Sequence, residues 1–244
     1  MLRNFIGTSG WCYNHWVGRF YPENLYSYRW LEYYMKKFDT VELNASFYRL
    51  PREKTFENWR KRTPENFLFS VKMNRFVTHV KRLLESKNEL KNFFSRVSKL
   101  EEKCGPILIQ LPPSLEFEMS RTEKFLRELE KNYRNYKFTI ECRNETWFNK
   151  GVYDLFKEYS IALCISDTPN YPYVEKITAD FVYVRLHGHE VLYASNYSEE
   201  QLQDWASKIR KWNNKDLDVY VYFDNDADAY AVFNALRLKE ILNN

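Results

Sequence analysis

Short runs rich in β-branched and aromatic residues recur along the chain and predict eight strands. Between most of these runs lie longer segments in which apolar residues recur at helical spacing. The predicted strands are Phe5–Ser9, Asp39–Asn44, Phe67–Lys72, Pro106–Leu111, Lys137–Cys142, Ile161–Asp167, Phe181–His187 and Asp218–Asp224. Alternation of this kind is typical of an α/β fold with parallel strands.

Four of the remaining segments carry helical signals. Ser120–Tyr133 and Ser198–Trp212 each open with a serine that is followed by Glu123 or Gln201 at the spacing of a capping box. The other two predicted helices are Ser27–Phe38 and Ala227–Leu242. The proline-rich link Thr168–Ala179 is too short to predict a full helix.

Eight strands that alternate with helices within 244 residues predict one domain, residues 1–244, folded as a TIM (β/α)8 barrel. An open, doubly wound sheet is the alternative. No G-x-G-x-x-G motif follows any predicted strand, so the sequence carries no nucleotide-cofactor motif and the barrel is favoured.

Composition and charge exclude some classes of protein. Hydrophobic residues make up 44% of the chain, which is enough for a substantial core, and no run of roughly 18 apolar residues predicts a membrane span. The net charge of +4 is too small to indicate nucleic-acid binding by itself. The N-terminus lacks a signal-peptide pattern, and the four cysteines form no C-x-x-C pair. We therefore expect a cytoplasmic protein with reduced cysteines and no membrane association.

Polar side chains collect at the predicted C-terminal ends of the strands, where TIM barrels hold their active sites. A single polar group there would be an ordinary solvated strand terminus, but repetition across most of the strands indicates a convergent polar pocket. The residues are Glu42, Asn44, Lys72, Gln110, Glu141, Arg143, Asp167, Arg185, His187, Asp224 and Asn225.

The run Phe181–His187 places its tyrosine, arginine and histidine on one face, because strand side chains alternate with a period of two residues. The valines and the leucine on the other face need apolar cover from the helices, so the polar face is expected to line the barrel interior. An isolated buried charge is costly. We therefore expect Glu141 or Asp167 within hydrogen-bonding reach of Arg185.

Aromatic residues make up 18% of the chain, and many follow the predicted strand ends. Some are expected to cap the hydrophobic interior, while an aromatic rim around a polar mouth also suits the stacking of sugar rings or nucleobases. Those that follow strand ends are Trp11, Tyr13, Trp16, Phe47, Tyr48, Trp147, Phe148, Tyr171, Tyr173, Tyr193 and Tyr197.

Several of these stretches, in the same order, resemble the YecE-like family (domain of unknown function 72), and the resemblance covers almost the whole chain. It implies a TIM barrel, in agreement with the strand count, but the family's name states no reaction. The matching stretches are IGTSGW (Ile6–Trp11), FYP (Phe20–Pro22), TVELNASFYRLP (Thr40–Pro51), FSVK (Phe69–Lys72), TH (Thr78–His79), ILIQLPPS (Ile107–Ser114), IECRNETWF (Ile140–Phe148), SDTP (Ser166–Pro169), VYVRLHG (Val182–Gly188) and VYFDNDADAYAVFNA (Val221–Ala235).

The residue types at the mouth favour an enzyme that acts on a small polar, anionic ligand such as a phosphorylated or sugar-like metabolite. Arginine suits phosphate or carboxylate, and histidine titrates near neutral pH. The predicted catalytic residues are Glu141, His187 and Asp167. The predicted substrate-binding residues are Trp11, Glu42, Asn44, Lys72, Gln110, Arg143, Arg185, Tyr193 and Asn225.

Metal dependence is left open by the sequence. A zinc cluster needs several imidazoles on different strands, whereas only His187 of the four histidines ends a predicted strand. Mg²⁺ or Mn²⁺ bound by carboxylates remains an alternative. The candidate ligands are Glu42, Glu141, Asp167 and Asp224.

Two other classes of function compete with the enzyme hypothesis. In a nucleotide- or nucleic-acid-binding protein, including a nuclease by fold analogy with the endonuclease IV group, rim aromatics would stack bases while basic residues contact phosphates. Those basic residues are Arg49, Arg52, Lys72 and Arg75. The third class is a scaffold for protein interactions, and no particular protein partner is inferred.

Overall fold

The computed structural model describes residues 3–243, and strands form at all eight predicted places. The sixth predicted strand is divided in two, which gives nine strands in the described part of the chain. The strands are β1 (Asn4–Thr8), β2 (Thr40–Leu43), β3 (Leu68–Lys72), β4 (Cys104–Gln110), β5 (Phe138–Glu141), β6 (Ile161–Leu163), β7 (Ile165–Asp167), β8 (Phe181–Leu186) and β9 (Asp218–Phe223).

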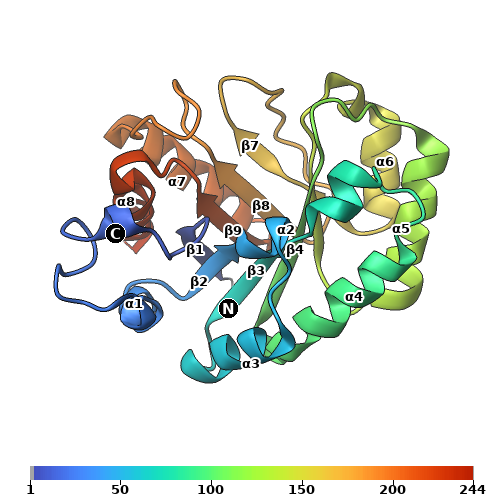
Figure 1. Ribbon diagram of the computed structural model, residues 1–244. Helices are drawn as coiled ribbons and strands as arrows, with labels where there is room; N and C mark the ends of the chain where they lie inside the picture. Colours follow the sequence, from blue (N-terminus) through green and yellow to red (C-terminus); the bar gives the residue numbers. More distant parts are fainter. Residues whose placement is uncertain (1–2, 244) are drawn as a thin grey trace.

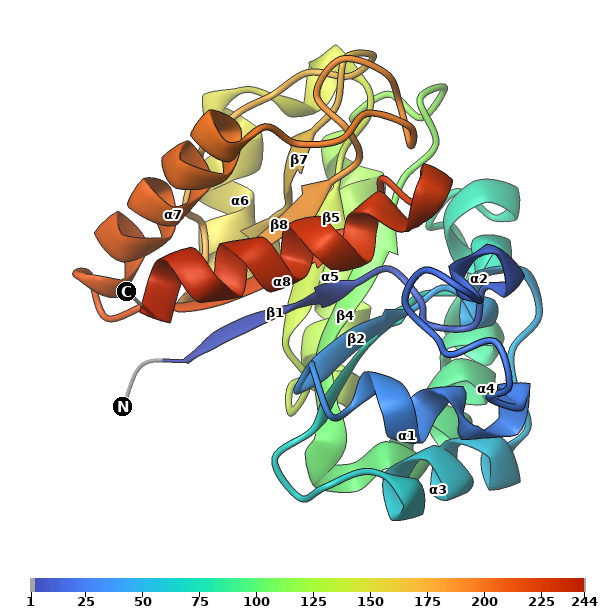
Figure 2. The same ribbon diagram turned by 90° about the vertical axis from the view of Figure 1, so that its left-hand side faces the viewer.

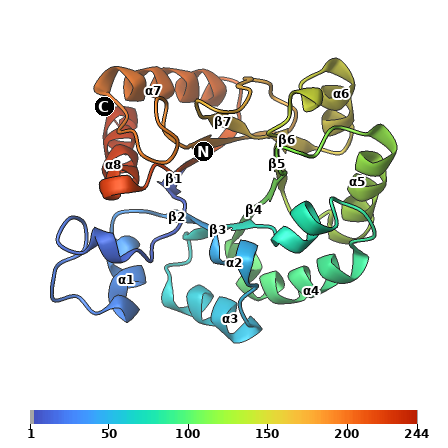
Figure 3. The same cartoon turned by 45° about the horizontal axis from the view of Figure 1, so that its top comes forward.

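All strand pairs are parallel and form two sheets, with the orders β1-β9-β8-β7 and β2-β3-β4-β5-β6. The sheets approach each other at two places. On one side only Cys164 separates β6 from β7. On the other, Ser9 and Glu42 form an isolated parallel bridge. Figure 3 shows the strands curving around a central axis, with the helices outside them.

The helices cover the outer faces of the sheets. Figure 1 shows α4, α5 and α6 on one side of the strands and α7 and α8 on the other, and in Figure 2 α8 lies across the strands near β1. The α-helices are α1 (Trp30–Tyr34), α2 (Ala45–Tyr48), α3 (Glu53–Arg62), α4 (Lys87–Val97), α5 (Met119–Tyr133), α6 (Lys150–Glu158), α7 (Glu199–Asn213) and α8 (Tyr230–Asn243). Short 3₁₀ or π segments are Asn14–Trp16, Ser27–Arg29, Phe76–Val80, Ser98–Lys103, Glu145–Trp147 and Ala227–Ala229.

The helix termini confirm one sequence prediction and correct two. The capping box that begins α7 is present, with reciprocal hydrogen bonds between Ser198 and Gln201. The predicted box at Ser120 is wrong: Glu118 is the N-cap of α5, and its carboxylate accepts hydrogen bonds from the backbone N–H groups of Ser120 and Arg121. The predicted helix Ser27–Phe38 is also too long, because a 3₁₀ turn precedes the short α1 and turns follow it.

Strand β8 has the predicted orientation. Its valines and leucine belong to the large apolar cluster that includes the helices. Tyr183 instead packs in a smaller interior cluster with Phe5, Leu108 and Tyr222, so residues from both sheets meet there. The polar face of β8 therefore continues upward from this interior cluster toward the carboxyl ends of the strands. No helix within residues 3–243 is long and apolar enough to cross a membrane.

Candidate functional site

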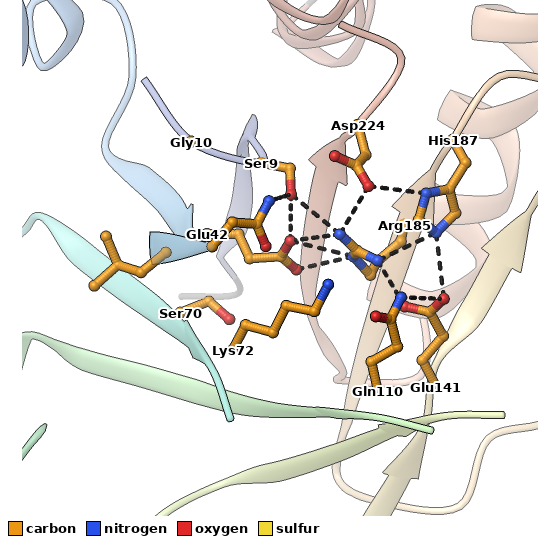
Figure 4. Close-up of polar contacts among 12 residues, drawn as sticks. Ser9, Gly10, Glu42, Ser70, Lys72, Gln110, Glu141, Arg185, His187 and Asp224 are labelled. Carbon is orange, nitrogen blue, oxygen red and sulfur yellow. Dashed lines mark hydrogen bonds and ion pairs between the residues drawn. The ribbon is translucent and has the colours of Figure 1, made fainter. Parts of the chain in front are cut away.

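Arg185 is fully buried and lies at the centre of an ionic cluster at the carboxyl end of β8 (Figure 4). Its Nη1 is 2.7 Å from Glu141 Oε2, which is the contact expected from the sequence. Its Nη2 is 2.8 Å from Glu42 Oε1 and 2.9 Å from Asp224 Oδ2. Nη2 also donates to the Ser9 hydroxyl at 3.1 Å, and Nε donates to Glu42 Oε2 at 3.0 Å. Every nitrogen of this guanidinium therefore has an oxygen partner.

Glu42 connects the two sheets through its carboxylate. The Ser9 hydroxyl on the β1 side donates to Oε1, and Tyr183 Oη on β8 donates to Oε2 at 2.7 Å. Ser9 Oγ in turn accepts a hydrogen bond from Asn44 Nδ2 at 2.6 Å. A buried carboxylate is costly unless it is paired and hydrogen-bonded, and Arg185 together with the two hydroxyls meets that requirement.

Glu141 is a second fully buried carboxylate, at the end of β5. Its Oε1 accepts from Arg143 Nε at 2.7 Å and from Gln110 Nε2 at 3.1 Å. Burial alone would raise the pKa of Glu141, but the positive charges of Arg143 and Arg185 outweigh it and hold that pKa well below its usual range. The carboxylate is therefore ionised at neutral pH.

His187 is buried between Arg185 and Asp224. Its Nε2 lies 3.2 Å from Arg185 Nη1 and 3.4 Å from Glu141 Oε1. Its Nδ1 is 2.9 Å from Asp224 Oδ2 without the alignment of a regular hydrogen bond. Burial would raise the pKa of Asp224, but the charge of Arg185 overcomes it, and the pKa falls to about 2.

Lys72 ends β3 and extends toward the Arg185 cluster, yet Figure 4 shows no ion pair or hydrogen bond to its amine. The residue is only 8% exposed. Among residues 3–243, the recorded contact of Nζ is with the ring of Phe47, whose centroid is 4.4 Å away. Burial lowers the pKa of Lys72 to about 8, and the nearby charge of Arg185 adds to the effect.

Arg143 presents a second incompletely paired cation. Its Nε is held by Glu141, and its Cζ lies 4.7 Å from the ring centroid of Tyr171. Its Nη2 is buried and has no hydrogen-bond partner in the described part of the chain. Tyr193 lies close by, with its ring 5.4 Å from that of His187, and is 40% exposed. The cationic edge formed by Lys72 and Arg143 thus differs from the saturated cluster around Arg185.

Two predicted site residues lie apart from this cluster. Asp167 Oδ1 is 3.1 Å from His189 Nδ1 and borders a separate cavity of about 330 Å³. Asn225 Nδ2 donates to Ser195 O and to Asn234 Oδ1, both at 2.9 Å. The amide of Asn225 therefore ties the loop after β9 to α8 and does not contact Arg185.

Trp11 and Asn44 border a larger cavity of about 540 Å³, beside the Arg185 cluster. Asn44 reaches both, because its amide donates to Ser9. Trp11 packs edge-on against Trp59, with the ring centroids 5.4 Å apart. Aromatic side chains dominate the wall of this cavity, which also includes Tyr13, Tyr28, Tyr48 and Arg62.

Sequence reasoning left Ser9 and Tyr183 out of the predicted site, and it gave Asp224 only as a polar strand-end residue and a candidate metal ligand. The strand period could have found them. Phe5 faces the interior, so the same face of β1 leads to Ser9, and the interior Tyr220 and Tyr222 of β9 lead to Asp224.

The carboxylates of the cluster converge on a guanidinium. Glu42, Glu141 and Asp224 each contact Arg185, which occupies the space between them. Within residues 3–243, no group of three His, Cys, Asp or Glu side chains is arranged to hold a metal ion. The arrangement is therefore an internal ion-pair network, and it is bordered by Lys72 and Arg143, two cations that are incompletely paired.

Comparisons with known proteins place this site within a family. The sequence profile described as "Protein of unknown function DUF72" matches residues 5–244. The chain belongs to the DUF72 family. The UPF0759 protein YunF of Bacillus subtilis (strain 168) is 27% identical over an alignment of 271 residues, gaps included, that covers 98% of this chain and 94% of YunF.

Solved structures agree with that membership. The crystal structure of a DUF72 family protein from Thermotoga maritima MSB8 has a TM-score of 0.88 and 30% sequence identity, covering 99% of this chain and 100% of the other. The glycoside hydrolase family 5 enzyme PbGH5A from Prevotella bryantii B14 has a TM-score of 0.51 and 8% identity, covering 98% of this chain and 96% of the other. The latter likeness concerns the TIM-like α/β fold alone.

Proposed function

We propose that this DUF72 protein is an enzyme that binds a small anionic ligand at the carboxyl ends of its strands. In this proposal the two sheets form one (β/α)8 barrel and one domain. Cys164 joins β6 to β7 on one side, and the bridge between Ser9 and Glu42 joins β1 to β2 on the other. The strand ends would then form a single mouth, the usual place of the active site in such barrels.

Arg143 is the proposed anchor for the anion, and its unpartnered Nη2 is the observation that carries the proposal. Glu141 fixes Nε of the same guanidinium, while Tyr171 lies against it. A buried donor without a partner is costly, and a phosphate or carboxylate oxygen would remove that cost. Lys72 supplies a second positive group, since its amine extends toward the Arg185 cluster and has no ion-pair partner among the residues drawn in Figure 4.

Arg185 was expected to bind the anion, but its geometry favours a positioning role. Its donors are already occupied by Glu42, Glu141, Asp224 and Ser9. A ligand would have to displace one of these buried contacts. We therefore assign Arg185 to holding the carboxylates in place, and Glu141 in turn to orienting Arg143.

The acid–base roles of Glu141, His187 and Asp167 remain predictions. Glu141 is stabilised as an anion, which makes it a weak base. The ring nitrogens of His187 face Arg185 and Asp224. Asp167 instead pairs with His189 beside another cavity. Direct proton transfer by any of them would require a rearrangement when the substrate binds.

A thermal-shift screen of small phosphates, carboxylates and neutral sugars tests the proposed site. A ligand that binds only the folded protein raises its melting temperature. Anionic compounds should raise the melting temperature of the natural chain, and Arg143→Gln should remove most of that shift. Arg121→Gln on α5 is the matched control and should retain it. A shift by anions that survives both Arg143→Gln and Lys72→Met would contradict the proposal.

A nucleotide- or nucleic-acid-binding function is the second candidate, favoured by the aromatic cavity of about 540 Å³ beside the cluster. Tyr28 and Tyr48 are strongly exposed at its edge and could stack on bases. However, Arg62 in its wall already pairs with Glu32 at 2.8 Å. Filter binding of nucleic acid at increasing salt concentration tests this second candidate. Contacts with phosphates predict a steep loss of affinity as salt is added. Absence of binding would reject the nucleic-acid-binding function.

A further inference from the structure

Lys72 differs from the other cations of the cluster because its buried amine has no acidic partner among residues 3–243. Its Nζ lies over the ring of Phe47 at 4.4 Å from the centroid. Arg185 and Arg143, in contrast, each contact Glu141. The Lys72 residue is 8% exposed, so few water molecules can solvate the ammonium form. An amine in such surroundings is a stronger candidate for nucleophilic chemistry than for a permanent ion pair.

We propose that Lys72 forms a Schiff base with an aldehyde or ketone that carries a phosphate or carboxylate group. This inference rests on the proposed anion site, because Arg143 would hold the charged group while the carbonyl carbon reaches Lys72. It narrows the substrate class from anions in general to anionic carbonyl compounds.

Burial of Lys72 favours a neutral amine under mild conditions. Burial lowers the pKa of Lys72 to about 8, with a further lowering from Arg185, against the opposing effects of Glu141, Asp224 and Glu42. His79 lies near the same cations, and burial together with Lys72 and Arg143 lowers its pKa to about 4. His79 is therefore neutral near pH 7 and does not compete as a cation.

The chemical step balances without a metal or a redox partner. The lone pair of the neutral Nζ attacks the carbonyl carbon, and the electrons of the C=O π bond move to oxygen. One proton passes from nitrogen to that oxygen and gives a carbinolamine. The second nitrogen proton and the hydroxyl group then leave as water, and a C=N bond remains.

Reductive trapping tests the inference on the full-length protein. The probes are dihydroxyacetone phosphate and pyruvate, with uncharged dihydroxyacetone for comparison, each incubated with cyanoborohydride. Trapping adds the mass of the probe less one oxygen atom, and peptide mapping locates the adduct. At pH 8 we expect labelling of Lys72 to exceed that of the exposed Lys137 by about tenfold or more, because more of its amine is neutral. The labelling rate should rise with pH around 8 and then level off.

Two variants make the result decisive. Lys72→Arg keeps the positive charge and should lose the adduct, while the buried Lys103 should remain unlabelled in every sample. Labelling spread evenly over surface lysines, or an adduct that persists in Lys72→Arg, would overturn the inference. Arg143→Gln separates it from the anion-site proposal. If dihydroxyacetone phosphate and uncharged dihydroxyacetone label Lys72 equally in the natural chain and in Arg143→Gln, then Arg143 is not the anchor for the anion, although the Schiff base at Lys72 stands. If anions raise the melting temperature through Arg143 but Lys72 never labels, the Schiff base is wrong.

Discussion

Two buried lysines lie at opposite ends of the neighbouring strands β3 and β4. Lys103, just before β4, is 5% exposed and donates to Arg60 O at 2.7 Å and to Thr63 O at 2.6 Å. It thereby satisfies carbonyl groups at the C-terminal end of α3, where a positive charge is favourable. Lys72, at the end of β3, is 8% exposed, and within the described part of the chain its amine contacts the ring of Phe47 without a hydrogen-bond or ion-pair partner.

The difference shows how burial alone fails to reveal the role of a charged residue. The lysine at the amino end of the strands stabilises the fold, because it donates to the carbonyl groups of Arg60 and Thr63 at the end of α3. The lysine at the carboxyl end makes no hydrogen bond or ion pair within residues 3–243, and its amine lies over the ring of Phe47. A cation retained in a costly environment without structural benefit is a candidate for function.

The largest effect is expected when a fully paired cation of the mouth is removed. Arg185→Met should lower the free energy of unfolding by about 3–5 kcal/mol, because Glu42 and Glu141 would remain buried without their shared counter-charge. Urea denaturation at pH 7 measures the change. A loss below about 1 kcal/mol would mean that the carboxylates find other partners, and the distinction between paired and unpaired cations would fail.

A smaller loss is expected from Lys103→Met, which would leave two carbonyl groups and a hydroxyl without their donor. We expect a decrease of about 2–3 kcal/mol in the free energy of unfolding. Lys72→Met is the matched variant and should leave stability at pH 7 unchanged or increase it. Equal losses for the two substitutions would show that the two lysines are structurally equivalent.

The pH dependence of stability should reveal Lys72 directly. Its pKa is about 8 in the folded chain and near the usual lysine value of 10.5 in the unfolded chain. Between these values the unfolded chain binds more protons, so the free energy of unfolding rises with pH. The gain between pH 8 and 10 should be on the order of 2 kcal/mol relative to Lys72→Met. Urea denaturation of the natural chain and of Lys72→Met across this pH range measures the difference. If the Lys72 amine has the usual lysine pKa in the folded chain, the two free energies of unfolding would change in parallel with pH.

The smallest effect is expected for Lys137, whose Nζ lies 5.1 Å from the ring centroid of Phe181. This residue is exposed, so its contact with an aromatic face contributes little. Lys137→Met should change the free energy of unfolding by about 0.5 kcal/mol or less. A larger change would indicate that the ring beneath a lysine is itself a strong stabilising partner, and Lys72 would then need reinterpretation.

The sequence predicted those features that a local period controls. The inward face of β8 and the contact between Arg185 and Glu141 follow from two-residue alternation and from the cost of an unpaired charge. The division of the sixth strand at Cys164 could not be read in this way. Residues 161–165 are continuously apolar, and the break reflects a change of neighbour from β5 to β8.

The partners of the buried charges were likewise beyond local reasoning. Many carboxylates end the strands, and only the three-dimensional arrangement decides that Glu42 saturates Arg185 while Asp167 turns to His189. The failed capping box at Ser120 has the same origin. Glu123 pairs with Arg127 at 2.6 Å, and Glu118 caps the helix instead.

The bridge between Ser9 and Glu42 also has a consequence for biosynthesis. Both residues leave the ribosome before Arg185, which follows Glu42 by 143 residues. A nascent chain that has not reached β8 therefore carries an uncompensated carboxylate on an unfinished strand edge, and the long-range contact that closes it forms late. Prematurely terminated chains should for this reason be bound by chaperones or degraded. In completed chains, Arg185 supplies the positive charge that pairs with Glu42 and stabilises β1 and β2.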